Sequence, residues 1–172
     1  LVLLDRRHMR VAVQRNAVGI EPIDGLDFDA SVAPGTANNA VGIFALSADV
    51  SGATLDGVTI TSNSPGISGI SAARLFGSND TALNVVGDTE LAEVTTDNTS
   101  APETIAFTGF SDPIPTSTRY LILAIDVDAG ASASDVQFFL SGPSDLTITG
   151  AAEISEVNGS IPISGPAPRV QM

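Results

Sequence analysis

The sequence contains no cysteine, lysine or tryptophan, and its one histidine is His8. The lack of cysteine excludes disulfides, thiolate nucleophiles and zinc–thiolate sites. A single histidine excludes a Ser-His-Asp triad and a multi-histidine metal site within one chain. Neither G-x-x-x-x-G-K-[ST] nor a G-x-G-x-x-G between strand and helix is present, so phosphate-binding loops are excluded too. We therefore expect no enzyme activity, no catalytic residue and no cofactor, and His8 is expected to be solvated.

Basic residues are scarce: the chain has seven arginines against 20 acidic residues, and its formal net charge is −13. Binding to nucleic acid needs a basic surface, so nucleic acid is excluded as a partner. The same charge disfavours binding to anionic membrane surfaces. No run approaches the roughly 18 apolar residues that a membrane-spanning helix needs, so we expect no membrane insertion within this chain.

Positive charge is concentrated at the start of the chain. Residues 1–15 hold four arginines and one aspartate, a net charge of +3, whereas residues 16–172 hold three arginines and nineteen acidic residues, a net charge of −16. We call residues 1–25 the N-terminal arm and residues 26–164 the body, and residues 165–172 form a Pro-rich tail. The positive charge of residues 1–15 therefore complements the negative charge of the rest of the chain.

The body is expected to be all-β. Residues 26–32 alternate strictly between apolar and polar, which is typical of a half-buried strand, and residues 41–50 are apolar on both faces, as in a strand covered on both sides. Turn-forming residues separate such segments throughout the body. The spacing favours an antiparallel two-sheet β-sandwich, Ig-like or jelly-roll-like. Further strands are expected at 54–61, 73–76, 89–94, 104–110, 119–128, 135–140, 145–151 and 160–164.

The clearest strand covers residues 119–128. Every second residue is apolar and is predicted to face the core, while the opposite face becomes acidic at Asp126 and Asp128. Strand rise places these two carboxylates about 7 Å apart, and Asp135 follows beyond a loop. Paired carboxylates at a strand end could supply some of the roughly six to eight oxygens that calcium takes. Asp126, Asp128 and Asp135 are therefore weak calcium candidates, and the simpler alternative is a set of solvated edge residues.

The order of segments in the body follows a recognisable pattern. It has a PG loop before an apolar strand (SVAPGTANNAVGIFALSADVSG), a short strand (LDGVTIT), a segment ISAARLF that leads to DTELAE, and PIPTSTRYLILAIDVDAGASASDVQFFL followed by NGSIPIS. This order resembles a β-sandwich module that recurs in secreted and surface-attached prokaryotic proteins. The resemblance implies a structural or adhesive role, an extracellular or cell-surface location and no enzyme activity. The loop that is rich in Asp and Asn in related modules retains only Asn79, Asp80, Asn84 and Asp88 here.

Three N-x-S/T sequences fall in expected loops, at Asn79, Asn98 and Asn158. They are acceptors for N-linked glycans if the host glycosylates exported proteins, so glycans are a further expected partner. The chain has one tyrosine and no tryptophan. This composition argues against sugar binding by ring stacking.

The arm contains a second kind of pattern, because residues 9–14 would form a strand with one apolar face, Met9, Val11 and Val13, opposite Arg10, Ala12 and Gln14. An apolar strand on a solvated arm promotes aggregation unless it pairs with another strand. Strand addition to a neighbour supplies main-chain hydrogen bonds, and opposite charge orients the encounter. Such a contact joins copies head to tail and propagates into a ring or a filament. The expected assembly residues are Met9, Arg10, Val11, Val13 and Arg15.

The sequence thus predicts a structural subunit of an extracellular fibre or surface assembly, whose partners are copies of itself. Three alternatives stay open. The arm folds back as the first strand of its own body, or it forms a helix, because Leu, Arg, Met, Ala and Gln are good helix formers. In the third alternative, the chain is an adhesive or carbohydrate-binding β-sandwich module of a larger secreted protein.

Overall fold

The computed structural model describes residues 17–22, 32–62, 69–96, 104–131, 134–135, 138–140, 143–151, 153–156, 163–164 and 169–170. Within these residues the one helical element is a single 3-10 turn, η1 (Pro143–Asp145), and no helix is long and apolar enough to cross a membrane. The strands are β1 (Ala17–Pro22), β2 (Asn39–Ala48), β3 (Ala53–Ser62), β4 (Ile70–Ser78), β5 (Thr89–Thr95), β6 (Thr104–Ile114), β7 (Arg119–Val127), β8 (Ser134–Asp135), β9 (Phe138–Leu140), β10 (Leu146–Thr149), β11 (Glu153–Glu156), β12 (Ile163–Ser164) and β13 (Arg169–Val170).

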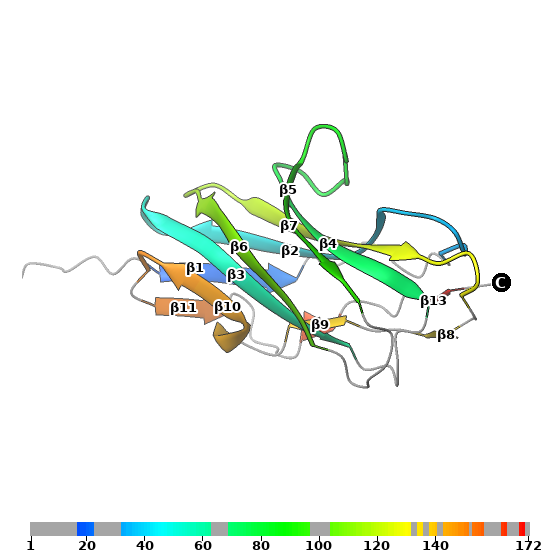
Figure 1. Cartoon of the computed structure of the whole chain (residues 1–172). Helices are drawn as coiled ribbons and strands as arrows, with labels where there is room; N and C mark the ends of the chain where they lie inside the picture. The colour runs from blue at the N-terminus through cyan, green and yellow to red at the C-terminus, as the bar shows by residue number, and fades with distance from the viewer. Residues whose placement is uncertain are drawn as a thin grey trace, which may run out of the picture.

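These strands form two principal sheets (Figure 1). In the first sheet the order is β11-β1-β2-β7-β4-β5, and neighbours are antiparallel except for the parallel pair of β1 and β11. In the second sheet β3 pairs with β6 on one edge and with β10 and β9 on the other, and β12 extends the sheet from β9. A separate pair joins β13 to β8.

The two principal sheets share one hydrophobic core. Leu55 and Ile60 of β3 and Phe107 of β6 belong to the same buried cluster as Leu121 and Leu123 of β7. Side chains on alternate residues of a strand point to the same face, so each sheet contributes one apolar face to this cluster. The predictions of an all-β chain and of antiparallel sheets are therefore confirmed.

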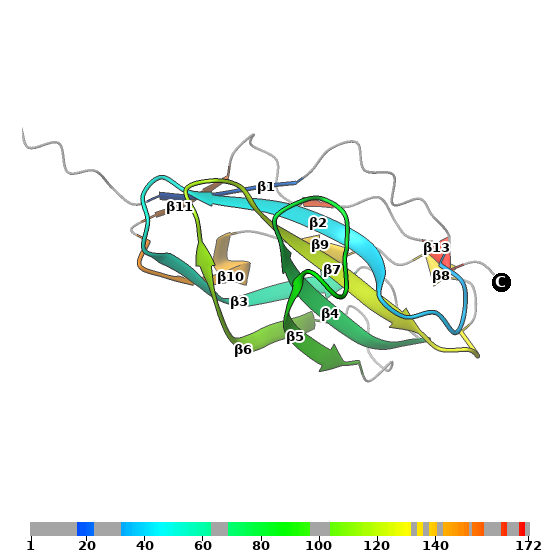
Figure 2. The same ribbon diagram turned by 90° about the horizontal axis from the view of Figure 1, so that it is seen from above.

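The first sheet is also covered on the face that points away from this core, which we call the outer face. Ile43 of β2, Phe76 of β4, and Ile122 and Ala124 of β7 form a second buried cluster, the outer cluster. Leu83, in the loop between β4 and β5, packs against the outer cluster, and Figure 2 shows this loop lying over β2 and β7. Burial on both faces explains why β2 is apolar at successive positions, as its sequence predicts.

Strand β7 confirms the alternation predicted for it. Leu121, Val127 and the alternate residues between them lie in the shared core, whereas Ile122 lies in the outer cluster. Ile122 is paired in register with Ile43 of β2 and with Phe76 of β4. One face of β7 therefore contributes to the shared core, and the other face contributes to the outer cluster.

The structure also has three strands that the sequence pattern does not predict, namely β1, β11 and β13. Strand β1 lies within the arm and pairs with β2 and β11, and β13 lies in the Pro-rich tail and pairs with β8. Each has six residues or fewer, and alternation over so short a segment is a weak signal. The strands predicted from residue 41 onward correspond to β2 to β10 and β12. Most of the first predicted strand, residues 26–31, lies outside the described residues.

Candidate functional site

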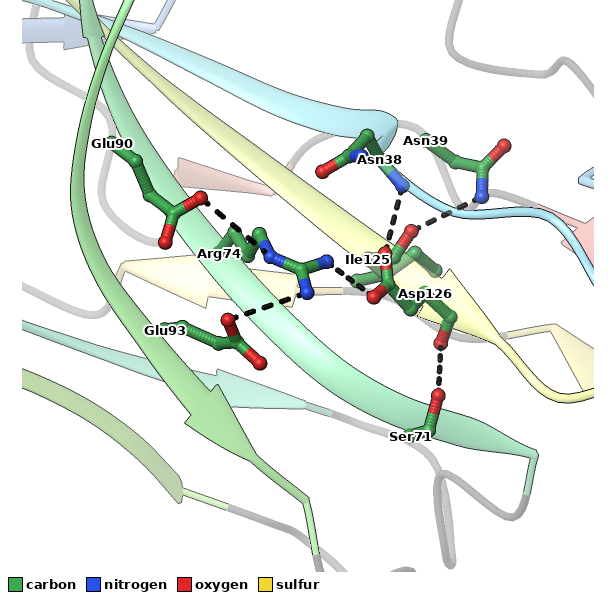
Figure 3. A network of polar contacts seen from close by, with 8 residues as sticks. All are labelled: Asn38, Asn39, Ser71, Arg74, Glu90, Glu93, Ile125 and Asp126. Atoms are coloured by element: carbon green, nitrogen blue, oxygen red, sulfur yellow. Dashed lines mark hydrogen bonds and ion pairs between the residues drawn. The ribbon is translucent and has the colours of Figure 1, made fainter. Parts of the chain in front are cut away.

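An ionic cluster lies on the outer face of the first sheet (Figure 3). We define the Arg74 cluster as Arg74 of β4, Asp126 of β7, and Glu90 and Glu93 of β5. The guanidinium of Arg74 donates a hydrogen bond through Nη1 to Asp126 Oδ2. Its Nη2 lies 3.3 Å from Glu93 Oε2, and its Nε lies 3.7 Å from Glu90 Oε2. One guanidinium thus joins carboxylates from the strands on both sides of β4.

Strand register explains part of this arrangement. Arg74 is paired with Ala124 of β7, whose side chain belongs to the outer cluster, and with Glu93 of β5. Paired residues in neighbouring strands present their side chains on the same face of a sheet. Arg74 and Glu93 therefore lie beside the outer cluster on the outer face.

A β-bulge brings the second glutamate of β5 to the same face. The register of β5 against β4 shifts between Ala92 and Glu90, so Leu91 has no paired residue of its own. An extra residue in one strand interrupts the strict alternation of faces. Glu90 and Glu93, which strict alternation would place on opposite faces, therefore both reach Arg74.

The members of the cluster differ in burial. The side chains of Arg74 and Asp126 are each 17% exposed, whereas those of Glu90 and Glu93 are 46% and 44% exposed. The pKa of the Arg74 guanidinium is raised, mainly by its hydrogen bond to Asp126, while burial acts in the opposite direction and the charges of the three carboxylates add to the rise. Arg74 therefore stays protonated, and Asp126 is its principal partner.

Asp126 is held from a second side by the loop before β2. The backbone N–H of Asn38 donates to Asp126 Oδ1 at 2.8 Å, and Asn39 Nδ2 donates to the carbonyl of Ile125 at 3.1 Å (Figure 3). Asn38 has a φ of 57°, in the left-handed region. Both carboxylate oxygens of Asp126 thus accept hydrogen bonds from the protein, which fixes this loop against β7.

The three calcium candidates lie in different environments. Asp126 is engaged by Arg74 and Asn38, as described. Asp128 is exposed just after β7, and its backbone N–H donates to the carbonyl of Gly69 at 2.7 Å. The side chain of Asp135 lies outside the described residues. Among the residues that are described, no group of three His, Cys, Asp or Glu side chains is placed to hold a metal ion, and calcium binding by this set stays a prediction.

The loop between β4 and β5, residues 79–88, is held by its own polar side chains. Asp80 Oδ1 accepts a 2.9 Å hydrogen bond from the backbone N–H two residues later, and Asp88 Oδ2 accepts one of 2.8 Å from the N–H of Asn84. Asn84 Oδ1 accepts from the N–H of Gly87 at 3.1 Å. The side-chain oxygens of Asp80, Asn84 and Asp88 thus accept hydrogen bonds from backbone N–H groups of their own loop.

The tip of this loop is apolar and solvent-exposed. Val86 is 97% exposed and Val85 is 47% exposed, and they are the exposed large hydrophobic side chains of the described residues. Leu83, two residues earlier, packs against the outer cluster instead. The loop is therefore anchored by one apolar residue and presents two others to solvent.

A second ion pair joins the two principal sheets. Arg119 of β7 donates from Nε and Nη2 to the two carboxylate oxygens of Asp112 in β6, each at 3.0 Å, and from Nη1 to Asn79 Oδ1 at 3.2 Å. The two charged side chains are 13% and 10% exposed. Gly77 leaves room for the guanidinium, because a Cβ at that position would lie 2.4 Å from Nη2. This ion pair links neighbouring ends of the two sheets.

The local sequence pattern does not identify partners for Arg74 and Arg119. The signal in the sequence is a lone arginine in an otherwise apolar strand. Because a mostly buried charge needs a paired charge or hydrogen bonds, such an arginine indicates a partner elsewhere in the fold. The partners themselves depend on register between strands distant in sequence. The chemistry of both sites is that of structural arginine–carboxylate pairs, which fix strands and loops relative to one another.

The remaining predicted sites are only partly covered by the structure. Asn79 is exposed at the start of the loop after β4, which leaves its predicted role as a glycan acceptor open. Asn98 and Asn158 lie outside the described residues, as do His8 and the assembly residues Met9, Arg10, Val11, Val13 and Arg15.

Comparison with known families and proteins gives no relative from which a function could be transferred: no family model matches this chain, and no curated protein matches it significantly.

Proposed function

We propose that this chain is a non-enzymatic structural subunit of an extracellular fibre or cell-surface assembly, built on a β-sandwich of Ig-like or jelly-roll-like type. Copies join head to tail when the basic arm of one copy adds as a strand to the acidic body of the next. The contact uses two different surfaces, so it is heterologous and propagates along a fibre unless the geometry closes a ring.

The observation that carries this proposal is the distribution of charge. Arg74 and Arg119 are the basic side chains that the structure describes in the body, and both are paired with carboxylates. Over residues 16–172 acidic residues far outnumber arginines, and the net charge is −16. Residues 1–15, by contrast, carry a net charge of +3. Charge complementarity therefore favours contact between an arm and a body, and it accelerates their encounter.

Residues 17–22 of the arm form β1 of the chain's own first sheet, so the proposed donor segment is residues 9–15. Both edges of β1 are already paired, with β2 on one side and β11 on the other. The proposed strand over residues 9–15 would be separated from β1 by Asn16 alone. A hairpin needs a loop of about two residues, so this strand would be too close to β1 to fold back beside it. A strand continuing in line with β1 would instead reach about 23 Å further, at about 3.3 Å per residue.

Sheet edges in the body supply acceptors for an added strand. In the described part of the chain, β5 is hydrogen-bonded to β4 alone as the last strand of its sheet, and β6 is bonded to β3 alone. Main-chain groups along such edges pair readily with a further strand.

The test compares the intact chain with a variant that lacks residues 1–15. We expect the intact chain to form concentration-dependent oligomers in size-exclusion chromatography and fibres in negative-stain microscopy, and the shortened chain to stay monomeric. Replacing Arg10 and Arg15 by Gln is the matched control for charge, and it should weaken assembly most at low salt. An intact chain that stays monomeric at high concentration, with a truncation that lowers only thermal stability, would refute the proposal.

A further inference from the structure

The Val85–Val86 tip combines two properties of a docking element. It is apolar and exposed, with 97% exposure at Val86, and it stands on a loop whose backbone N–H groups donate hydrogen bonds to the side-chain oxygens of Asp80, Asn84 and Asp88. Loop ends that hold a fixed shape lose little conformational entropy on binding. Val85 and Val86 are adjacent, so their exposed side chains form one small apolar patch, the kind of surface that a partner buries on binding.

The loop is also anchored to the body below its tip. Leu83 packs against the outer cluster, and Asn84 Oδ1 accepts hydrogen bonds from the backbone N–H groups of Val86 and Gly87, at 3.3 Å and 3.1 Å. Figures 1 and 2 show the loop rising from the outer face of the first sheet. The two valines are therefore held at the tip of the loop, where their side chains face solvent.

The charges around the tip indicate the chemistry of its partner. Residues 79–88 include two aspartates and no basic residue, and Glu90 and Glu93 follow along β5. Arg74, the cation next to these glutamates, shares its single positive charge among Asp126, Glu90 and Glu93, so this group keeps a net negative charge. An apolar tip beside surplus acid fits an occupant that is apolar along one face and basic along the other, and it disfavours anionic lipid.

Resting on the proposed function, we propose that the Val85–Val86 tip, which leads into the edge strand β5, is the side-chain contact for the N-terminal arm of a second copy that adds along this edge. In an extended arm Met9, Val11 and Val13 share one face, Arg10 lies on the opposite face, and Arg15 ends the segment, and residues 1–15 carry a net charge of +3. The apolar side chains of the arm pack on the two valines, and its arginines lie toward the carboxylates of the loop and of β5. Met9, Val11 and Val13 supply the apolar face, and Arg10 and Arg15 supply the charge.

The first experiment removes apolar character without changing shape. The full-length double variant Val85→Thr/Val86→Thr keeps the volume of both side chains, and Val85→Ile/Val86→Ile is the control that keeps them apolar. Self-association is measured by sedimentation, with circular dichroism to verify folding. We expect the Thr variant to associate at least about tenfold more weakly, because apolar area leaves the interface, and the Ile variant to associate as the intact chain does.

The second experiment identifies what touches the tip. A photo-reactive amino acid replaces Val86 in the full-length chain, which is mixed with isotopically labelled copies and irradiated. We expect cross-links between Val86 of one copy and residues 1–15 of a differently labelled copy. A reporter at Ser51, an exposed turn residue, is the control and should give no such cross-link. Cross-links confined to one copy, or directed to another surface, would overturn the inference.

The outcomes separate this inference from the proposed function. If deletion of residues 1–15 abolishes assembly but the Thr variant assembles normally, the arm docks elsewhere and the inference fails while the proposed function stands. If deletion of the arm leaves assembly unchanged, both fail. Loss of assembly in both variants, with cross-links to the arm of another copy, supports both.

Discussion

The guanidinium of Arg119 binds both carboxylate oxygens of Asp112 across the two principal sheets, with two N–O distances of 3.0 Å. Both side chains are almost withdrawn from solvent. A charge that is largely buried destabilises the fold unless its partner charge is present. The pair therefore couples the stability of β7 in one sheet to that of β6 in the other.

Replacing Arg119 by Met should destabilise the protein by about 3 kcal/mol, because the Asp112 carboxylate then stays buried without its cation. Urea denaturation measures the loss as a lower midpoint with an unchanged slope. The double variant Arg119→Met/Asp112→Leu should recover part of the loss, since no unpaired charge remains. Equal midpoints for the intact protein and the single variant would show that the pair contributes nothing to stability.

Gly77→Ala should destabilise the intact protein through the same ion pair. The added Cβ would lie 2.4 Å from Arg119 Nη2, so the guanidinium must move away from Asp112. In the Arg119→Met background the substitution should cost much less, because the crowding atoms are absent. A double-mutant cycle in urea measures this coupling, and additive effects of the two substitutions would contradict it.

In the Arg74 cluster, Asp126→Asn should cost more stability than Glu93→Gln. Asp126 is mostly buried and accepts hydrogen bonds from Arg74 and Asn38, whereas Glu93 is 44% exposed and its pairing is screened by solvent and salt. We expect about 0.5 kcal/mol or less for Glu93→Gln, and less still in high salt. Chemical denaturation at low and high salt measures both values, and an equal cost for the two variants would be the contrary result.

The raised pKa of Arg74 sets the sign of its pH dependence. A group whose pKa is higher in the folded state stabilises the fold fully at pH values below its unfolded pKa, and that contribution is lost as the pH rises through the folded value. For an arginine this loss falls at extreme alkaline pH. The stability difference between the intact protein and Arg74→Met should therefore stay constant between about pH 7 and pH 10, as measured by urea denaturation at each pH.

Asn38→Gly should be at least as stable as the intact protein, and Asn38→Ala should be less stable than Asn38→Gly by about 1 kcal/mol. Asn38 has a positive φ, and its side-chain Oδ1 is buried with no hydrogen-bond partner among the described residues. Glycine accepts this backbone conformation and keeps the N–H that binds Asp126, whereas alanine is strained. Thermal unfolding compares the three proteins, and a more stable alanine variant would contradict the assignment of strain.

Leu83→Ala should loosen the loop at residues 79–88 by removing its contact with the outer cluster. The expected loss in global stability is about 1 kcal/mol, and proteolytic cleavage within the loop should accelerate severalfold. Val86→Ala is the control, because Val86 is almost fully exposed and makes no comparable contact with the core. Equal cleavage rates in the two variants would show that Leu83 does not anchor the loop.

Strand β7 shows how much of the fold is predictable from sequence. Its period-two alternation correctly places Leu121 in the shared core and Ile122 on the opposite face. Such alternation is local, since neighbouring residues in a strand always point to opposite faces. The clustering of positive charge in residues 1–15 is likewise a property of the sequence alone, and it is the basis of the assembly proposal.

The candidate sites depended on contacts that no local pattern encodes. Glu90 and Glu93 meet Arg74 because a bulge at Leu91 shifts the register of β5, and Arg119 meets Asp112 because the two sheets share a core. The sequence by itself thus determined the all-β class, most of the strands and the separation of charge. Only the tertiary structure decided which charges pair and which apolar side chains stay exposed, because both depend on registers and packing between strands far apart in the chain.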